Sequence, residues 1–298
     1  MERAPLWFQA AVATPFEECQ VEVEGCAINY LRWGDRDKPG LVLVHGGAAH
    51  AHWWSYLAPQ LMSDYHIAAL DLSGHGDSGH RDMYGCSIWS DEVMAVASDA
   101  GMISPIIVGH SMGGIVAIVA ASLYGADLAG TIIVDSPVRR PDPESEEGAQ
   151  GNVFRNAKTY PRIASALERF RLFPPQPCEN GYIIDHIARH SLKEVENGWT
   201  WKFHNGVFQR PFEAIHEHLA DVGCRIALFR AEYSMIVTPD VNDYMSELLH
   251  HNAPVVEIPD CHHHLTVDQP LAFLAALRAI LADWEYTVPR LSAGADCS

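Results

Sequence analysis

The chain has 298 residues, of which 48% are hydrophobic, and a formal net charge of -18. This size and mix are typical of a large globular domain with an insertion, or of two smaller domains. The negative charge disfavours nucleic acid and anionic membranes as partners, because both are polyanions. No apolar run could span a bilayer, and the N-terminus lacks the features of a secretory signal. We therefore expect a cytoplasmic protein.

The cysteines favour reduced thiols over a disulfide framework or a zinc site. They are odd in number, scattered, and form no C-x-x-C pair: Cys19, Cys26, Cys86, Cys178, Cys224, Cys261 and Cys297.

Strand signals recur along the chain. Alternating polar and apolar residues around Gly25 predict a β-hairpin over 20–33. "GLVLVHGG" and "HIAALDLSGHGDSG" are short apolar runs that end in glycine-rich loops, as expected of strands buried on both faces. Four more such strands are "SPIIVGHS", "AGTIIVDSP", "CRIALFRAE" and "APVVEIPD".

Helix-length segments separate these strands, at 54–62, 87–100, 112–124, 239–250 and 270–284. Strands that alternate with helices predict an α/β fold, with a mostly parallel sheet covered on both faces. The alternation stops between about 136 and 219, where a polar loop precedes helical stretches. We predict a core of 1–136 and 220–285, a helical cap over 137–219, and a loose tail over 286–298.

One serine stands at a sharp bend. Gly109-His110-Ser111-Met112-Gly113 fits G-x-S-x-G, with a strand before it and a helix after it, as that motif demands. Such a turn exposes the serine hydroxyl beside the N-terminus of the helix, whose amides can stabilise negative charge. The alternative is a glycine-rich turn in which Ser111 only caps the helix.

With this motif the chain resembles the α/β-hydrolase family from about residue 20 to 284. The resemblance also rests on "HGGAAHAHWW", "DLSGHGDS" and "IPDCHHHLTVDQP", each after its expected strand. It implies an eight-stranded sheet and a nucleophile–histidine–acid triad, often under a helical lid. It implies no cofactor.

The resemblance implies that the general base lies in the loop after the last strand, shortly before an acidic residue and a proline that open the final helix. Spacing back from Asp268 and Pro270 selects His263, with His262 and His264 as alternatives. Three consecutive histidines also suggest a metal site, but neighbouring side chains on one loop rarely converge on one ion. We therefore predict no metal there.

The acid departs from the family's common pattern. The usual position, after the seventh strand, is Ser234, with Glu232 two residues early and Asp240 late. Some family members carry the acid at the end of the sixth strand, where this chain has Asp135. We predict Asp135 as the acid and keep Glu232 as the alternative; Asp135 could also merely cap the loop backbone.

The oxyanion hole is expected from the backbone amides of Met112 and Gly47, since glycine allows close approach to a substrate. His45 and Asp71 are expected to be structural. His50 and His52 could face the site entrance or the surface. Most of the aromatic residues near the presumed pocket are expected in the core, and a few could line an apolar pocket: Trp53, Trp54, Trp89, Trp199, Trp201, Phe203 and Phe208.

These residues predict a serine hydrolase that cleaves carboxylic esters or lactones of small, largely apolar substrates. A serine nucleophile argues against epoxide hydrolase or dehalogenase chemistry, which in this family uses a carboxylate. Alternatives are hydrolysis of a carbon–carbon bond in a ring-fission diketone, or a cofactor-free perhydrolase. An alternative of another class is a small-molecule receptor without turnover.

Overall fold

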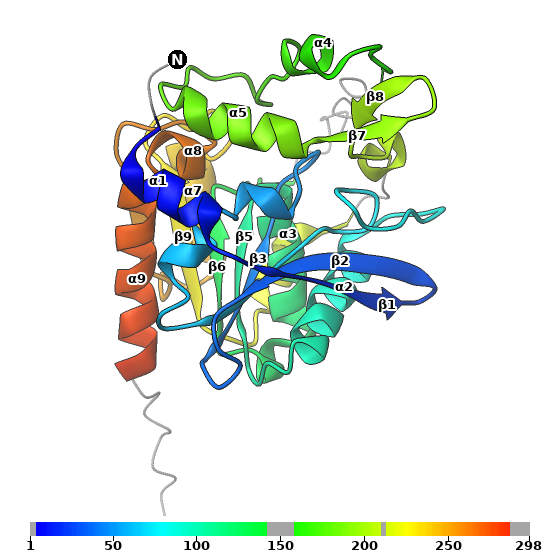
Figure 1. Cartoon of the computed structure of the whole chain (residues 1–298). Coiled ribbons are helices and arrows are strands. Elements are labelled where there is room, and N and C mark those ends of the chain that lie inside the picture. The colour runs from blue at the N-terminus through cyan, green and yellow to red at the C-terminus, as the bar shows by residue number, and fades with distance from the viewer. Residues whose placement is uncertain (1–3, 142–157, 210–212, 287–298) are drawn as a thin grey trace, which may run out of the picture.

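The computed structural model describes residues 4–141, 158–209 and 213–286. Its centre is an eight-stranded sheet in the order β1-β2-β4-β3-β5-β6-β9-β10 (Figure 1). β2 pairs antiparallel with both β1 and β4, and all other pairs are parallel. The strands are β1 (Glu17–Val23), β2 (Cys26–Trp33), β3 (Gly40–Val44), β4 (His66–Leu70), β5 (Ile106–His110), β6 (Gly130–Val134), β9 (Ile226–Ala231) and β10 (Val255–Ile258). The eight predicted strands and the mostly parallel sheet are confirmed.

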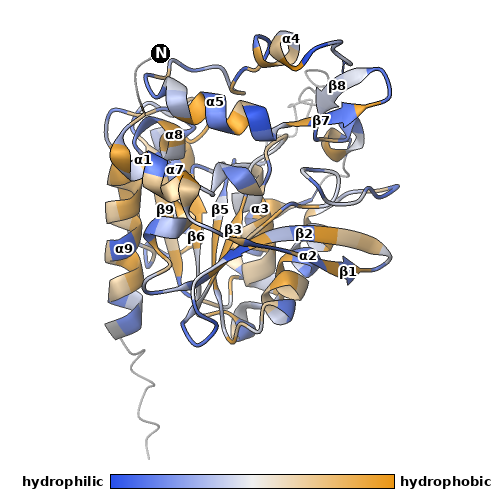
Figure 2. Cartoon of the chain, in the orientation of Figure 1, coloured by the Kyte–Doolittle hydropathy of each residue, from blue (hydrophilic) through white to orange (hydrophobic). Residues whose placement is uncertain are grey.

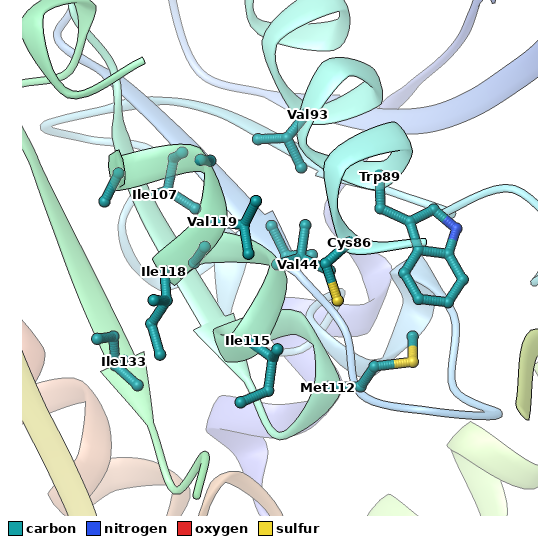
Figure 3. Packing of buried hydrophobic residues seen from close by; sticks show 14 of the residues in the cluster. Val44, Cys86, Trp89, Val93, Ile107, Met112, Ile115, Ile118, Val119 and Ile133 are labelled. Carbon is teal, nitrogen blue, oxygen red and sulfur yellow. The ribbon is translucent and has the colours of Figure 1, made fainter. Parts of the chain in front are cut away.

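The central strands are apolar because both of their faces are covered. Every residue of β3, β4, β5 and β6 is buried. Successive residues of β3 enter different clusters: Val42 and Val44 join one core, and Leu41 and Leu43 the other. Orange apolar segments run through the central strands in Figure 2, and Figure 3 shows the first core between α3 and α2.

Helices cover each face. α2 (Cys86–Asp99), α3 (Met112–Leu123), α6 (Ile215–Ala220) and α7 (Pro239–Leu248) contribute to the first core. α1 (Leu6–Ala13), which the sequence did not predict, and α9 (Pro270–Tyr286) pack on the second.

The predicted helix over 54–62 is wrong. That segment holds a short 3₁₀ turn instead, η2 (Ala58–Gln60), and a second 3₁₀ turn, η1 (Ala51–Trp53), lies just before it. Pro59 has no N–H to donate to the preceding turn, and it disfavours helical geometry at the residue before it. The apolar side chains of the segment still reach the second core, so its hydrophobic pattern is satisfied without an α-helix.

Between β6 and β9 lie α4 (Ile163–Leu167), α5 (Gly181–His190), the hairpin of β7 (Leu192–Val195) and β8 (Gly198–Trp201), η5 (Asn205–Phe208) and α6. The hairpin adds a small antiparallel sheet to a segment in which the sequence indicated mainly helices. Trp199, Thr200 and Trp201 favour a strand. Gly198 turns the chain at φ 132°, where a Cβ would lie 2.1 Å from the Tyr160 carbonyl oxygen.

In Figure 1, α4, α5 and the hairpin lie beyond the carboxyl ends of the parallel strands, whereas α6 packs on α3 and α7. The division into core and cap stays a prediction. Most of the polar loop that follows β6, and the predicted tail after Tyr286, lie outside the described residues. Of the described helices, none is long and apolar enough to cross a membrane. Six of the seven cysteines fall in the described parts, and each is a free thiol.

Asp71 joins three segments through a buried carboxylate. Its Oδ1 accepts the amide of Ala51 at 2.6 Å, and its Oδ2 accepts the amide of Asp77 at 2.9 Å and Nδ2 of Asn29 at 3.1 Å. Burial raises the pKa of Asp71 to about 6. These contacts confirm the structural role expected of Asp71.

Replacing Asp71 with alanine should lower the free energy of unfolding by about 3 kcal/mol, because three donors lose their buried acceptor. Urea denaturation measures this loss. Asp37→Ala is the control, since Asp37 is exposed and should change stability by less than about 0.5 kcal/mol. Equal stabilities of the two variants would contradict the structural role of Asp71.

Candidate active site

Ser111 occupies a strained turn between β5 and α3. Its backbone has φ 56° and ψ -120°, a conformation that residues other than glycine rarely adopt. Its N–H donates to the carbonyl of Val134 at 3.0 Å, so the end of β6 holds the turn. Strain of this kind costs on the order of 1–3 kcal/mol and clusters at functional sites.

The glycines around Ser111 are required by close backbone contacts. A Cβ on Gly109 would lie 2.2 Å from the Gly113 carbonyl oxygen. A Cβ on Gly113 would lie 2.4 Å from the carbonyl oxygens of Val44 and His45. The first turn of α3 therefore packs directly on β5 and on the end of β3, and this packing fixes the position of Ser111.

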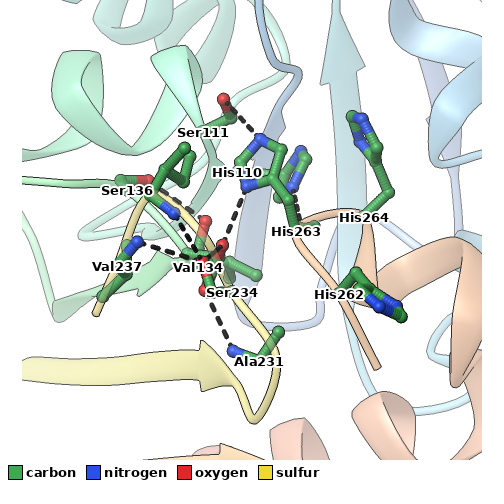
Figure 4. A network of polar contacts seen from close by, with 12 residues as sticks. His110, Ser111, Val134, Ser136, Ala231, Ser234, Val237, His262, His263 and His264 are labelled. Atoms are coloured by element: carbon green, nitrogen blue, oxygen red, sulfur yellow. Dashed lines mark hydrogen bonds and ion pairs between the residues drawn. The ribbon is translucent and has the colours of Figure 1, made fainter. Parts of the chain in front are cut away.

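His263 lies against Ser111, as Figure 4 shows. It stands in the loop between β10 and α8 (Leu265–Asp268). Its Nε2 accepts a hydrogen bond from the Ser111 hydroxyl at 3.0 Å, and its Nδ1–H donates to Oδ2 of Asp135 at 2.8 Å. His263 is 3% exposed and Asp135 is fully buried. The structure thus brings the predicted serine, histidine and aspartate into one hydrogen-bonded chain.

Asp135 follows β6 directly, with a left-handed φ of 47°. Besides His263, its carboxylate accepts the amide of Ala231 at 2.9 Å and the hydroxyl of Ser234 at 2.7 Å. Ser234 in turn accepts the amide of Val237 at 3.0 Å. Ser234, which the sequence analysis placed at the usual acid position, therefore donates to Asp135, the predicted acid. The sequence marked this position as a departure but did not predict the contact.

The structure does not bring Glu232 to His263. One carboxylate oxygen of Glu232 accepts the amide of Asp260 at 2.8 Å instead. Asp240 is exposed, in the first turn of α7.

The two neighbouring histidines have other partners. The amide of His262 donates to Oδ2 of Asp268 at 2.9 Å, and His262 lines a separate cavity that Ser111 does not line. Nε2–H of His264 donates to the carbonyl of Phe173 at 3.1 Å, and burial holds its pKa well below the usual range.

His110 is a residue that the sequence analysis missed. Its Nε2–H donates to the carbonyl of His263 at 3.0 Å, and the two ring centroids are 4.8 Å apart. Burial, followed by the nearby His263, lowers the pKa of His110 to about 3, so the ring is neutral at ordinary pH. Its place beside the nucleophile in G-x-S-x-G was the available signal.

Ring nitrogens of His110, His263 and His264 lie within 4.8 Å of one another. Both nitrogens of His263 already bond to Ser111 and Asp135, so this group is better suited to proton transfer than to holding an ion.

The two expected oxyanion donors lie close together. Met112 is the first residue of α3, where amides are free of intrahelical bonds. A Cβ on Gly47 would lie 4.0 Å from Cβ of Met112, and one on Gly46 would lie 3.2 Å from Cβ of Ser111. The loop after β3 therefore runs beside the start of α3 and next to the serine.

His45 supports that loop, as expected. Its Nε2 accepts the amide of Leu72 at 3.1 Å, and its Nδ1–H donates to the carbonyl of Gly46 at 2.7 Å. Burial lowers its pKa to about 4. His50 does not lie at the surface: it is 2% exposed, and its Nε2–H donates to the Ser191 hydroxyl at the end of α5.

The aromatic residues divide between core and site. Trp54 and Trp89 are fully packed in the core. Phe208 is half-buried beside Gly47: its Cε1 would lie 3.4 Å from a Cβ there. The ring of Trp53 lies 5.3 Å from that of His264. Trp199, Trp201 and Phe203 are half-buried on or just after β8.

Comparisons with known proteins support the fold. A family profile described as "Alpha/beta hydrolase family" matches residues 41–277. An esterase of Mycobacterium tuberculosis is 24% identical over 281 residues, which are 92% of each chain. A serine hydrolase-like protein of Danio rerio is 30% identical over 276 residues, covering 84% of this chain and 83% of the relative.

Among solved structures, E-2-(acetamidomethylene)succinate hydrolase superposes with a TM-score of 0.78 at 19% sequence identity. The match covers 90% of this chain and all of the other, and at this identity it supports the fold alone. Because the family profile spans most of the sequence, this chain belongs to the alpha/beta hydrolase family.

Proposed function

We propose that the protein is a serine hydrolase that cleaves carboxylic esters, with Ser111 as nucleophile, His263 as general base and Asp135 as acid. The observation that carries the proposal is the pair of hydrogen bonds that join these residues, 3.0 Å from serine to imidazole and 2.8 Å from imidazole to carboxylate. Distances of this size place a nucleophile within reach of its base, and orient the base through a third group.

The reaction follows from this arrangement. The Ser111 oxygen attacks the ester carbonyl while Nε2 of His263 takes the hydroxyl proton. The amides of Met112 and Gly47 hold the oxyanion, and the proton then passes from His263 to the departing alcohol oxygen. In the resulting acyl-enzyme, His263 takes a proton from water, whose oxygen attacks the carbonyl. The bond to the Ser111 oxygen then breaks as His263 returns the proton to that oxygen, and the acid is released. Asp135 keeps Nδ1 protonated and stabilises the imidazolium.

The proposed substrates are esters or lactones of small, largely apolar compounds. Phe208 beside Gly47, and Trp53 beside His264, would place apolar surface near the reacting carbon. The name of the Mycobacterium tuberculosis relative, an esterase, points to the same bond. We also propose that residues 137–219 act as a cap, since η5 within this segment carries Phe208 to the loop after β3.

The remaining expectations form part of the same proposal: a cytoplasmic enzyme that acts on a small molecule, without nucleic acid or membrane as partner. The free thiols of the described cysteines support a reducing compartment.

Ser111→Ala should lower kcat for p-nitrophenyl esters by a factor on the order of 10⁴ to 10⁶, because no other group replaces the nucleophile. The test compares the parent and the variant on the series from acetate to decanoate. Retained turnover in the variant would show that another residue or a contaminant performs the reaction.

Asp135→Asn should lower kcat by a factor on the order of 10⁴, because an amide does not stabilise the imidazolium and favours the wrong tautomer. Glu232→Gln is the matched control, since its partner is the Asp260 amide and a glutamine oxygen can still accept that bond. The same ester assay decides between them: a large loss only in Glu232→Gln would transfer the role of acid to Glu232.

The double variant Asp135→Asn/Ser234→Asp should recover at least about tenfold of the activity lost in Asp135→Asn. The Ser234 hydroxyl already lies 2.7 Å from the Asp135 oxygen that contacts His263, so a carboxylate there could restore the charge beside the imidazole. Asp135→Asn/Ser234→Asn, which adds the same bulk without charge, is the control for kcat/KM. Equal activity of the two double variants would refute the prediction that a carboxylate at position 234 can act on the His263 imidazole.

Failure of the parent on every ester would refute the ester proposal and leave the alternatives. Hydrolysis of a ring-fission diketone would then identify a carbon–carbon bond hydrolase, and peracid formation from a carboxylic acid and hydrogen peroxide would identify a perhydrolase. Binding of a small molecule that persists in Ser111→Ala, with no turnover by the parent, would identify a receptor.

A further inference from the structure

A second group of histidines lies away from Ser111, where α5 meets η1. His186 and His190 are one helical turn apart on α5, and His52 comes from η1. One ring nitrogen of each residue lies within 4.8 Å of the other two. The rings of His52 and His190 stack with centroids 4.0 Å apart, and those of His186 and His190 are 4.5 Å apart. In Figure 1, α5 passes over the segment that contains η1.

For two of the rings, the hydrogen-bond partners show which nitrogen is protonated and which has a free lone pair. A carbonyl can only accept, so the 2.8 Å contact of His190 Nδ1 with the His186 carbonyl makes Nδ1 the protonated nitrogen and leaves Nε2 basic. The Ser55 hydroxyl donates to the His52 carbonyl, so it accepts from Nε2–H of His186 at 2.8 Å. Nδ1 of His186 is then basic. Metal-binding histidines commonly donate their second N–H in this way.

The third ring has an unused nitrogen. Nδ1 of His52 is buried and has no hydrogen-bond partner among the described residues. Burial, followed by neighbouring imidazoles, lowers the pKa of His52 to about 3 and that of His186 to about 4. At neutral pH these two rings are therefore in the uncharged form that binds metal, without competition from protons.

The surroundings admit a cation. The three histidines are half-buried, so solvent can reach the group and supply a further ligand. The nearby charged side chains form ion pairs, Lys202 with Asp77 and Arg189 with Asp185, although Lys202 still contributes to the lowered pKa of His52.

We propose that His52, His186 and His190 form a binding site for a divalent transition metal ion, Zn²⁺ in the first instance, with water as the fourth ligand. Three imidazoles and an open position are an established zinc arrangement, and two histidines four residues apart on one helix face the same side. Zinc–nitrogen bonds of about 2.05 Å separate the ligand atoms by roughly 3.3 Å in a tetrahedron. Binding would therefore require side-chain rotations that bring the ligand atoms closer than the present spacing of up to 4.8 Å and unstack the rings of His52 and His190. The ion would join η1 to α5, beside the loop that carries the proposed oxyanion donor Gly47.

The test is equilibrium dialysis of the full chain, without a polyhistidine tag, against Zn²⁺ near neutral pH. We expect about one ion per chain with a Kd of about 10 µM or tighter. A hundredfold excess over Kd should raise Tm by roughly 3–6 °C. His52→Gln and His190→Gln, on separate elements, should each weaken binding at least about tenfold.

Two controls locate the ion. His216→Gln removes another half-buried helical histidine and should bind like the parent. His263→Asn should also bind like the parent, and a loss there would place the ion at the catalytic histidines and overturn the proposal. So would a parent that shows no saturable binding below about 100 µM, or unchanged affinity in both His52→Gln and His190→Gln. Zn²⁺ affinity is measured without any ester turnover, so the result does not depend on the esterase proposal. Ser111→Ala should therefore bind Zn²⁺ like the parent.

Discussion

The packing of α3 directly on β5 is the constraint on which the rest of the site depends. Gly109 and Gly113 leave no space for a Cβ between the helix and the strands. This contact forces the chain to reverse within one residue, and the residue that reverses is Ser111, at a positive φ. The strain is tolerated because β5 and α3 fix the two ends of the turn, and because the carbonyl of Val134 at the end of β6 accepts the N–H of Ser111. The same packing places the start of α3 beside the loop after β3, so that Ser111 and the two proposed oxyanion donors, Met112 and Gly47, are positioned together.

A buried carboxylate so close to this turn needs compensation, because burial of an unpaired charge is costly. Asp135 receives hydrogen bonds from an imidazole, a hydroxyl and a backbone amide. These come from the loops and strand ends of β9 and β10, which meet the end of β6 because parallel strands finish at the same edge of a sheet. Topology thus supplies the donors. Ser234 belongs to this set: a serine stands where a second carboxylate would repel the first.

Much of the fold could be predicted because buried parallel strands are nearly continuous apolar runs, and because glycines mark the turns. Ser111 was predicted from its motif. The resemblance to the family implied His263 and, because Ser234 occupies the usual acid position, Asp135. Other features depend on contacts between distant segments. The bond from His110 to the His263 carbonyl, and the meeting of His52 with α5, join residues that are far apart in the sequence. The prediction of a helix over 54–62 was wrong because it relied on the spacing of apolar residues, which does not reflect the effect of Pro59 on the backbone.

The hydrogen bond between Ser111 and His263 also has a consequence for the timing of synthesis. The two residues are 152 positions apart, and Asp135 and His263 are 128 apart. A ribosome therefore completes the strained serine turn, and the acid after it, long before it makes the imidazole that links them. Until the loop after β10 docks against His110, the growing chain holds a serine without its base. The proposed reactivity would then arise with the last strand, when the sheet that buries Asp135 is complete.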